Sequence, residues 1–403
     1  MSSIVMPTKD QLDRLVQPHL KTQPQGLGIV IDYASPSFSP RGYIHHAGNV
    51  ANQFGQSLTL SKDTPFLLAS VSKTFTATLY ALLLRQSDPS LTLGDYIAPN
   101  GPLNISSTLA GIPLDGLMNY TSGLPADNTG DANDSPAYLP QPYSLTAMLS
   151  YLDANPPAVS GTGSTYTYSN LGFAIMSAVL ASATTNPPTV GAFARLIRSN
   201  LLDPLGMQSC YFSQTPIALL PLGYQYNYES KPPCWKIAPG WSLFPAYYGA
   251  GGLVASPSDM LRWLLFNMGV VQDSTLTPLL PALQTPSTTV EAWGTTQLGL
   301  SWFITPATAT TSGVLWKDGD LDGCGSFIAF LQSGNPGTVP SEAGVFVLVN
   351  GGDMTGDQKN SGNEIAMVLA NDLLRIMQGQ TPPADKSQYP RSVTLTPKSK
   401  PTS

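Results

Sequence analysis

The stretch Leu67-Leu-Ala-Ser-Val-Ser-Lys-Thr-Phe-Thr-Ala-Thr-Leu-Tyr-Ala-Leu-Leu-Leu-Arg85 carries the strongest structural signal in this chain of 403 residues. Residues 70–85 contain no Gly or Pro, and they are apolar on nearly every side of a helix. This pattern predicts a buried helix. The single lysine of the stretch, Lys73, needs a partner or a chemical role, because a cation among apolar side chains is costly unless it is paired.

Strand and helix patterns lie on both sides of this helix. The chain begins with a helical pattern and two strand patterns, and three strand patterns and a helix return after residue 310. Their ranges are 8–20, 26–33 and 41–49 before the helix, and 312–316, 326–332, 344–350 and 362–378 after it. The order predicts an α+β fold with α/β/α-like layers, in which both ends of the chain form an antiparallel sheet flanked by the terminal helices.

The composition of the sequence changes between the N-terminal and C-terminal groups of strand and helix patterns. Pro, Gly, Ser, Thr and Asn separate short helical patterns at 144–153, 170–183, 191–202 and 257–269. We predict a sheet domain made of residues 1–87 and 311–379, a mainly helical insertion at 88–310, and an extended or disordered tail at 380–403. A functional site is expected between the sheet domain and the insertion.

Charged residues are scarce, and this excludes several functions. Asp, Glu, Lys and Arg make up 11% of the chain, whereas a soluble domain has roughly 25%. The 19 Lys and Arg are scattered and the net charge is −6, so nucleic-acid binding is not expected. No apolar run reaches the roughly 18 residues of a membrane helix, and no signal peptide is apparent. We therefore expect a cytoplasmic protein that does not bind membranes.

Histidine and cysteine narrow the chemistry further. The three histidines, His19, His45 and His46, all lie near the N-terminus, and no GxSxG motif is present. These facts exclude the α/β-hydrolase order of Ser, acid and His. The three cysteines do not have zinc-site spacing, and we expect no metal and no cofactor. A nucleophilic enzyme with this sequence would use a base other than histidine.

The first chemical motif is Ser70-Val-Ser-Lys73, at the start of the buried helix. A spacing of three puts both side chains on one helix face, where a lysine amine of lowered pKa can activate the serine. The helix N-terminus adds N–H groups that suit a developing oxyanion. The alternative is a helix cap followed by a lysine near the surface.

Two further motifs lie far away along the chain. In Tyr168-Ser-Asn170, the tyrosine can act as general acid or base where nearby lysines depress its pKa, and the amide can hydrogen-bond a lysine. The alternative is a packed tyrosine with Asn170 capping the next helix. In Lys317-Asp-Gly319, the lysine can place its ammonium beside a substrate that the glycine allows close to the backbone. The alternative is an acidic turn.

Together the three motifs resemble those of the serine β-lactamase and penicillin-binding-protein superfamily, most closely class C β-lactamases with the related esterases and acyltransferases. The likeness covers residues 10–378 and includes a Thr-Ser-Gly-Leu segment within 117–125. The resemblance implies a β-lactamase/transpeptidase-like fold.

The resemblance also implies catalytic roles. Ser70 would form an acyl-enzyme, and Lys73 and Tyr168 would shuttle its proton, with Tyr168 activating the incoming water or alcohol. Asn170 and Lys317 would hold this network and the substrate. The backbone N–H groups of Ser70 and Asp320 would form the oxyanion hole.

The third motif departs from the family at its middle residue. The family usually has Thr or Ser there, and in penicillin-recognising members that residue helps to bind a substrate carboxylate. This chain has Asp318, followed by Asp320 and Asp322, which alternate onto one side of a strand. Carboxylates there would repel an anionic substrate. We therefore expect little turnover of penicillins and a neutral or cationic acyl substrate.

Several functions stay open at this point. The chain can be an esterase or amidase acting on a small molecule, or an acyltransferase that passes the acyl group to an alcohol or amine acceptor. A true β-lactamase, a D-Ala carboxypeptidase or an inactive binding relative is less favoured, the last because all five motif side chains are intact. The sequence does not indicate the oligomeric state.

Overall fold

The computed structural model describes residues 4–20, 26–46, 50–52, 54–99, 101–127, 143–163, 165–212, 220–227, 234–237, 245–290, 296–309, 311–321, 323–351, 362–386 and 389. The helices are α1 (Lys9–Leu20), α2 (Ser72–Tyr80), α3 (Leu114–Met118), α4 (Leu145–Ala154), α5 (Asn170–Ser182), α6 (Val190–Ile197), α7 (Tyr248–Gly251), α8 (Pro257–Asn267), α9 (Leu280–Gln284) and α10 (Gly362–Met377). The strands are β1 (Gly28–Ser35), β2 (Phe38–His46), β3 (Phe66–Leu67), β4 (Tyr211–Phe212), β5 (Tyr224–Asn227), β6 (Cys234–Ile237), β7 (Leu253–Ala255), β8 (Thr288–Val290), β9 (Thr296–Leu298), β10 (Phe303–Thr305), β11 (Val314–Leu321), β12 (Cys324–Leu331) and β13 (Gly344–Val349).

The main sheet joins both ends of the chain, as the sequence predicts. Its eight strands have the order β2-β1-β13-β12-β11-β10-β9-β8, and each pairs antiparallel with its neighbours. The N-terminal strand β1 pairs with the C-terminal strand β13, with Ile31 opposite Val347. The predicted α+β class with an antiparallel sheet is therefore confirmed.

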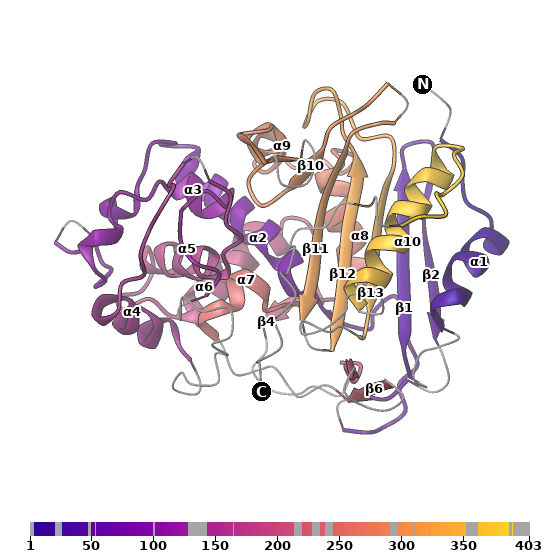
Figure 1. Ribbon diagram of the computed structural model, residues 1–403, viewed down its shortest axis with the longest axis horizontal. Coiled ribbons are helices and arrows are strands. Elements are labelled where there is room, and N and C mark those ends of the chain that lie inside the picture. The colour runs from indigo at the N-terminus through magenta and orange to yellow at the C-terminus, as the bar shows by residue number, and fades with distance from the viewer. Residues whose placement is uncertain are drawn as a thin grey trace, which may run out of the picture.

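Helices cover both faces of this sheet (Figure 1). The terminal helices α1 and α10 lie together on one face, where α10 packs on β12 and β13. On the other face, α8 packs on β1 and β13. Helix α2 lies between the sheet and the helical region that holds α3 to α7, because it contacts α5, α6 and α7 while the turn before it contacts β11. This position places the start of α2 at the junction predicted to hold the site.

The sheet extends further than the sequence patterns indicate. Strands β8, β9 and β10 fall within residues 88–310, which the sequence assigns to the helical insertion, yet they complete one side of the sheet. Each is only three residues long, and a strand this short has no alternating pattern to recognise. Helix α8, also assigned to the insertion, packs on the sheet.

The C-terminal segment is partly held against α10. Residues 380–386 have no regular secondary structure, as expected of an extended tail. However, Lys386 Nζ lies 2.6 Å from Asp372 Oδ2 on α10, and the buried Tyr389 donates its hydroxyl to Asp372 Oδ1. The rest of the predicted tail lies outside the described residues.

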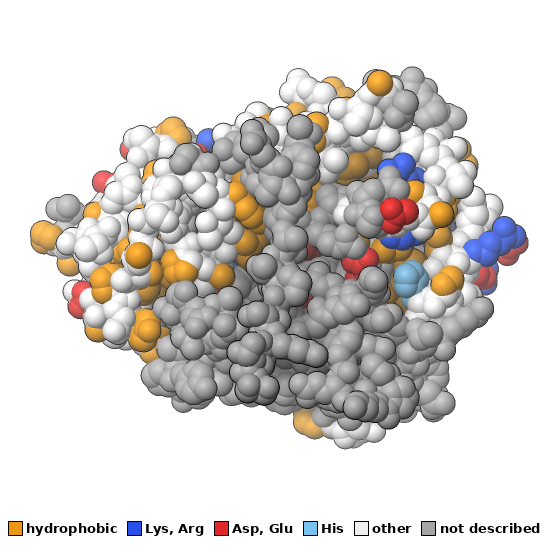
Figure 2. Space-filling view, viewed as in Figure 1, with side chains coloured by type: hydrophobic (Ala, Val, Ile, Leu, Met, Phe, Trp, Pro, Cys, Tyr) orange, Lys and Arg blue, Asp and Glu red, His pale blue; other side chains and the backbone are white. Residues whose placement is uncertain are grey.

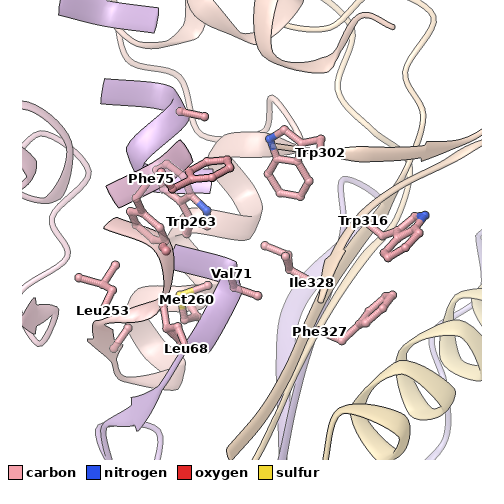
Figure 3. Packing of buried hydrophobic residues seen from close by; sticks show 14 of the residues in the cluster. Leu68, Val71, Phe75, Leu253, Met260, Trp263, Trp302, Trp316, Phe327 and Ile328 are labelled. Carbon is pink, nitrogen blue, oxygen red and sulfur yellow. The ribbon is translucent and has the colours of Figure 1, made fainter. Parts of the chain in front are cut away.

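Aromatic packing holds α2 against α8, the helix that packs on β1 and β13 (Figure 3). The rings of Phe75 and Trp263 stack with their centroids 3.8 Å apart, and Trp263 Nε1 donates to Thr74 Oγ1 at 3.0 Å. Trp316 and Phe327 stack on the opposite face of the sheet, beside α10. Every residue of α2 is buried, which confirms the predicted burial.

The surface reflects the scarcity of charge. On the face seen in Figure 2, charged side chains of the described residues are few and scattered among uncharged ones, and they form no basic patch. Among the described residues, no helix is both long and apolar enough to cross a lipid bilayer.

Asp32 on β1 is expected to make the stability of the fold depend on pH. It is buried, and its Oδ2 has no hydrogen-bond partner among the described residues. Burial raises the pKa of this carboxyl to about 7, from an ordinary value of 3.8. The folded state therefore keeps a proton that the unfolded chain releases. The stability from this group is fully present below pH 3.8 and is lost as the pH rises to about 7.

We expect Asp32→Asn to remove this loss. Relative to the unmodified chain, its free energy of unfolding should rise progressively between pH 4.5 and 8, by up to about 4 kcal/mol at pH 8. Urea unfolding across this range measures the difference. The exposed Asp153 on α4, changed to Asn, is the matched control. A difference that stays constant with pH would contradict the assignment of the titration to Asp32.

Candidate active site

Ser70 lies in a tight turn rather than in the helix itself. A 3₁₀ turn, η1 (Ala69–Val71), precedes α2, and Ala69 has a φ of 46°, a left-handed conformation that residues with a Cβ rarely adopt. Hydrogen bonds hold the turn, because Leu68 N donates to Leu253 O at 2.9 Å and Ser326 Oγ donates to Leu68 O at 2.7 Å. Strain fixed in this way is typical of a functional position.

The predicted helix over 70–85 is therefore continuous but not uniform. It comprises the turn η1, then α2, and then a π-helical segment, η2 (Ala81–Arg85). The tight first turn leaves Ser70 partly exposed, whereas Lys73, one turn later, is fully buried.

Three oxygen atoms surround the Lys73 ammonium. Nζ lies 2.8 Å from Ser70 Oγ, 2.8 Å from Asn170 Oδ1 and 2.7 Å from Ala250 O. An ammonium has three N–H donors, so these three acceptors satisfy it completely. A neutral amine fits equally well, because it can donate to the amide and the backbone carbonyl and accept the Ser70 hydroxyl proton. The site thus accommodates both protonation states.

Tyr168 approaches the same serine from another side. Its hydroxyl donates to Ser70 Oγ at 2.7 Å. The nitrogens of Lys73 and Lys317 lie 5.0 and 5.3 Å from the centroid of its ring, within the range of cation–π attraction, and Tyr120 stacks on the ring at 5.1 Å. Both lysines of the sequence motifs therefore meet at this one tyrosine.

Asn170 begins α5, but it is not the helix cap considered as an alternative. Ser169 fills that role, since its hydroxyl accepts from Gly172 N at 3.0 Å. The Asn170 side chain instead lies between two charged groups. Its Oδ1 accepts from Lys73, and its Nδ2 donates to Asp127 Oδ1 at 3.4 Å.

Strand β11 runs directly beside the Ser70 turn. A Cβ at Gly319 would overlap the Leu68 carbonyl oxygen and would lie 3.1 Å from Ser70 N, so only glycine allows this approach. Lys317 is fully buried and donates to the carbonyl oxygen and to Oδ1 of Asp318, at 2.7 and 2.6 Å. Asp318 is therefore not the unpaired carboxylate that the sequence analysis expects, because the preceding lysine forms a buried ion pair with it.

The surroundings shift the pKa values in directions that separate the roles. Burial lowers the pKa of Lys73 well below its usual range, and the charge of Lys317 lowers it further, against the carboxylates of Asp127 and Asp318. Burial and Asp318 raise the pKa of Tyr168 well above its usual range, although its hydrogen bond to Ser70 opposes the rise. These directions favour a neutral amine and a neutral phenol, so Lys73 is the better base.

The structure brings four predicted side chains into one hydrogen-bonded network. Hydrogen bonds connect Ser70, Lys73, Tyr168 and Asn170, and the bonded pairs are up to 98 residues apart in the sequence. Lys317 joins them through the Tyr168 ring. Asp320 lies on the same strand and is partly exposed, and Asp322 falls outside the described residues.

Sequence reasoning missed Asp127, which contacts Asn170. It follows the Thr-Ser-Gly-Leu segment by three residues, and the only signal was the presence of an acid there in a chain with few charges. It also missed the carbonyl of Ala250, because a backbone acceptor leaves no trace in the sequence.

Comparison with known proteins identifies the family. The family model described as "Beta-lactamase" matches residues 30–371. The chain belongs to the beta-lactamase family. The sequence resemblance to the serine β-lactamase and penicillin-binding-protein superfamily is thereby confirmed, and the chain is a member of a serine hydrolase family.

Relatives within the beta-lactamase family have diverse names. The D-alanyl-D-alanine-carboxypeptidase/endopeptidase AmpH of Escherichia coli (strain K12) is 25% identical over 374 residues, which cover 88% of this chain and 85% of the relative. The unguisins hydrolase ungD' of Aspergillus campestris is 24% identical, over 68% of this chain and 51% of the relative. The solved D-amino acid amidase of Ochrobactrum anthropi superposes with a TM-score of 0.64 at 18% identity, covering 91% of this chain and 99% of the amidase, and shows the shared fold.

Proposed function

We propose that this chain is a serine hydrolase that cleaves an ester or amide of a small neutral or cationic substrate through a Ser70 acyl-enzyme. One observation carries the proposal. Ser70 Oγ lies within hydrogen-bonding distance of both Lys73 Nζ, at 2.8 Å, and the Tyr168 hydroxyl, at 2.7 Å. A serine hydroxyl is a weak nucleophile that needs an adjacent base, and this site supplies one without histidine.

Acylation begins with the neutral amine of Lys73. The amine takes the Ser70 proton as Oγ bonds to the substrate carbonyl carbon, and the carbonyl oxygen becomes an oxyanion. The backbone N–H groups of Ser70 and Asp320 are its proposed donors, since β11 passes beside the Ser70 turn. The bond from the carbonyl carbon to the leaving group then breaks. The leaving group takes a proton from Lys73 through the Tyr168 hydroxyl, and the acyl-enzyme remains.

Deacylation repeats these steps with water. The proton of the attacking water moves through the Tyr168 hydroxyl to Lys73 while the water oxygen bonds to the acyl carbon. The bond from this carbon to Ser70 Oγ breaks, and the proton returns to Ser70. The carboxylic acid is released, so one water is consumed in each cycle.

The Lys317–Asp318 ion pair supports a neutral or cationic substrate. Two donors of the Lys317 ammonium are taken by Asp318. A lysine occupied in this way attracts a substrate carboxylate weakly, because the paired charges largely cancel. An anionic substrate is therefore expected to bind weakly because Lys317 is no longer available to it, and not because an unpaired Asp318 repels it.

This ion pair predicts poor use of penicillins. We expect purified protein to hydrolyse penicillin G with a kcat/KM at least about 100-fold below that for a neutral p-nitrophenyl ester. Asp318→Thr should raise the penicillin value about tenfold, because a charge-assisted contact of about 1.4 kcal/mol becomes available at Lys317. Spectrophotometric assays measure both rates, and the melting temperature checks folding. Efficient penicillin hydrolysis by the unmodified chain would contradict the proposal.

Hydrolysis and acyl transfer share the acyl-enzyme and differ in the acceptor. The deciding experiment incubates the protein with p-nitrophenyl acetate, with and without an alcohol or amine acceptor, and identifies the products by mass spectrometry. Acetate as the sole acyl product supports a hydrolase. Faster nitrophenol release together with a new ester or amide would establish an acyltransferase instead.

A further inference from the structure

Asp127 is an acidic group within the active site that the proposed catalytic cycle does not use. It is partly exposed, and among the described residues its carboxylate makes one hydrogen bond, from Asn170 Nδ2 to Oδ1 at 3.4 Å, and no ion pair. A carboxylate has about four acceptor positions on its two oxygens. The described residues therefore leave most of the hydrogen-bonding capacity of Asp127, and all of that of Oδ2, to a bound molecule.

The two cations that the described residues place at the site, Lys73 and Lys317, already have other partners. Lys73 donates to Ser70, Asn170 and Ala250, which uses all three of its N–H groups. Lys317 pairs with Asp318. Burial raises the pKa of the Asp127 carboxyl, against its hydrogen bond from Asn170 and the charge of Lys73. Among the residues that the structure describes, the group thus lacks the partner that a half-buried carboxylate requires.

Asp127 can be reached from the nucleophile. Ser70, Asn170 and Asp127 are all partly exposed, whereas Lys73 lies buried beneath them. Hydrogen bonds connect Asp127 to Asn170, Asn170 to Lys73 and Lys73 to Ser70. Asn170 and Asp127 therefore lie near Ser70, so a molecule whose carbonyl carbon bonds to Ser70 can reach both side chains with one of its substituents.

We propose that Asp127 binds a primary ammonium on the acyl part of the substrate, next to the scissile carbonyl, and so selects aminoacyl esters or amides. This inference rests on the proposed function, because it assumes that Ser70 is acylated. The ammonium donates to Asp127 Oδ2 and supplies the cation that the described residues do not provide. No covalent bond to Asp127 is made or broken. Its role is to select the substrate and not to take part in the reaction.

The test compares three substrates with and without Asp127→Asn. These are alanine benzyl ester, N-acetylalanine benzyl ester, both as D and L forms, and p-nitrophenyl acetate. The unmodified chain should prefer the ester with an ammonium. The variant should lose about 10- to 100-fold in kcat/KM for that ester, because a charge-assisted hydrogen bond is removed. Measured at a pH where kcat/KM of both proteins no longer rises with pH, the other two substrates should change by less than about threefold.

The matched control is Asp10→Asn. Asp10 is exposed in the first turn of α1, on the far side of the sheet, and its replacement removes the same charge. This variant should keep the preference for the ammonium ester. An equal loss on all three substrates in Asp127→Asn would mean that Asp127 only positions Asn170, and an unchanged preference would mean that it does not contact the substrate. Either result overturns the inference.

A binding measurement separates this inference from the proposed function. Aminomethylboronic acid and acetamidomethylboronic acid differ in the ammonium and can form reversible adducts with a reactive serine. The inference predicts that Asp127→Asn weakens the first inhibitor at least about tenfold and leaves the second nearly unchanged. Similar weakening of both would overturn it. If neither binds and no ester is turned over by the unmodified chain, the proposed function fails and the inference fails with it.

Discussion

Ser70→Ala is expected to lower kcat/KM for p-nitrophenyl acetate by about 10⁴-fold or more, because the proposed acyl-enzyme forms on the Ser70 hydroxyl. The residual rate should be close to that of the uncatalysed reaction assisted only by binding and by the oxyanion donors. The substitution should leave the fold intact, since Ser70 is partly exposed and its hydroxyl bonds only Lys73 and Tyr168 among the described residues. Initial rates of nitrophenol release and the melting temperature measure the two effects.

Covalent labelling distinguishes loss of the nucleophile from general damage. A serine-directed fluorophosphonate should add one mass increment to the unmodified chain and none to Ser70→Ala. The matched control is Ser199→Ala, because Ser199 is exposed and, among the described residues, its hydroxyl bonds only two near neighbours in the chain: it donates to Arg195 O and accepts from Asn200 Nδ2. This control should be labelled and fully active. Nitrophenol release that survives Ser70→Ala, or labelling of another serine, would rule out the proposed mechanism.

The candidate site was predictable where chemistry and local geometry coincide. Ser70 and Lys73 are one helical turn apart, so their contact follows from the sequence once the helix is recognised. Tyr168 and Lys317 were assigned through the family resemblance, because nothing in their local patterns shows that both approach Ser70. The terminal elements were also predictable, since α1 and α10 have helical hydrophobic periodicity, and β1 and β13 are short, largely apolar runs.

Features that depend on tertiary contacts were not predictable. The pairing of Lys317 with Asp318 could not be foreseen, because neighbouring side chains on a strand normally point to opposite faces. Asp127 can be recognised as part of the site only in the structure, where Asn170 at the start of α5 hydrogen-bonds it. The three-residue strands β8 to β10 join the sheet because β11 offers them an edge for pairing. None of these contacts has a periodic signal.

The structure favours Lys73 over Tyr168 as the base for acylation. We therefore expect that replacing Lys73 also lowers kcat strongly. Lys73→Met should lower kcat by about 10³-fold, the usual contribution of a general base. Lys73→Arg should be nearly as inactive, because arginine keeps the positive charge but cannot release its proton. Neither variant can take the Ser70 proton. Pre-steady-state nitrophenol bursts should disappear in both variants, since acylation becomes the slow step.

The pH profile identifies which property of Lys73 matters. The amine must be neutral to act, so kcat/KM of the unmodified chain should rise with pH as Lys73 loses its proton. Burial and Lys317 lower the pKa of Lys73, so this rise should occur well below the pH at which an ordinary lysine titrates, near 10.5. Lys317→Met removes the neighbouring cation and should move the rise to higher pH, whereas Asp127→Asn removes a carboxylate and should move it to lower pH.

A profile that is identical in all three proteins would exclude Lys73 as the titrating base. Shifts of opposite sign in the two variants would show that the titrating base responds to both charges. A rise well below pH 10 would identify this base as Lys73 rather than Tyr168, because the surroundings lower the pKa of Lys73 and raise the pKa of Tyr168.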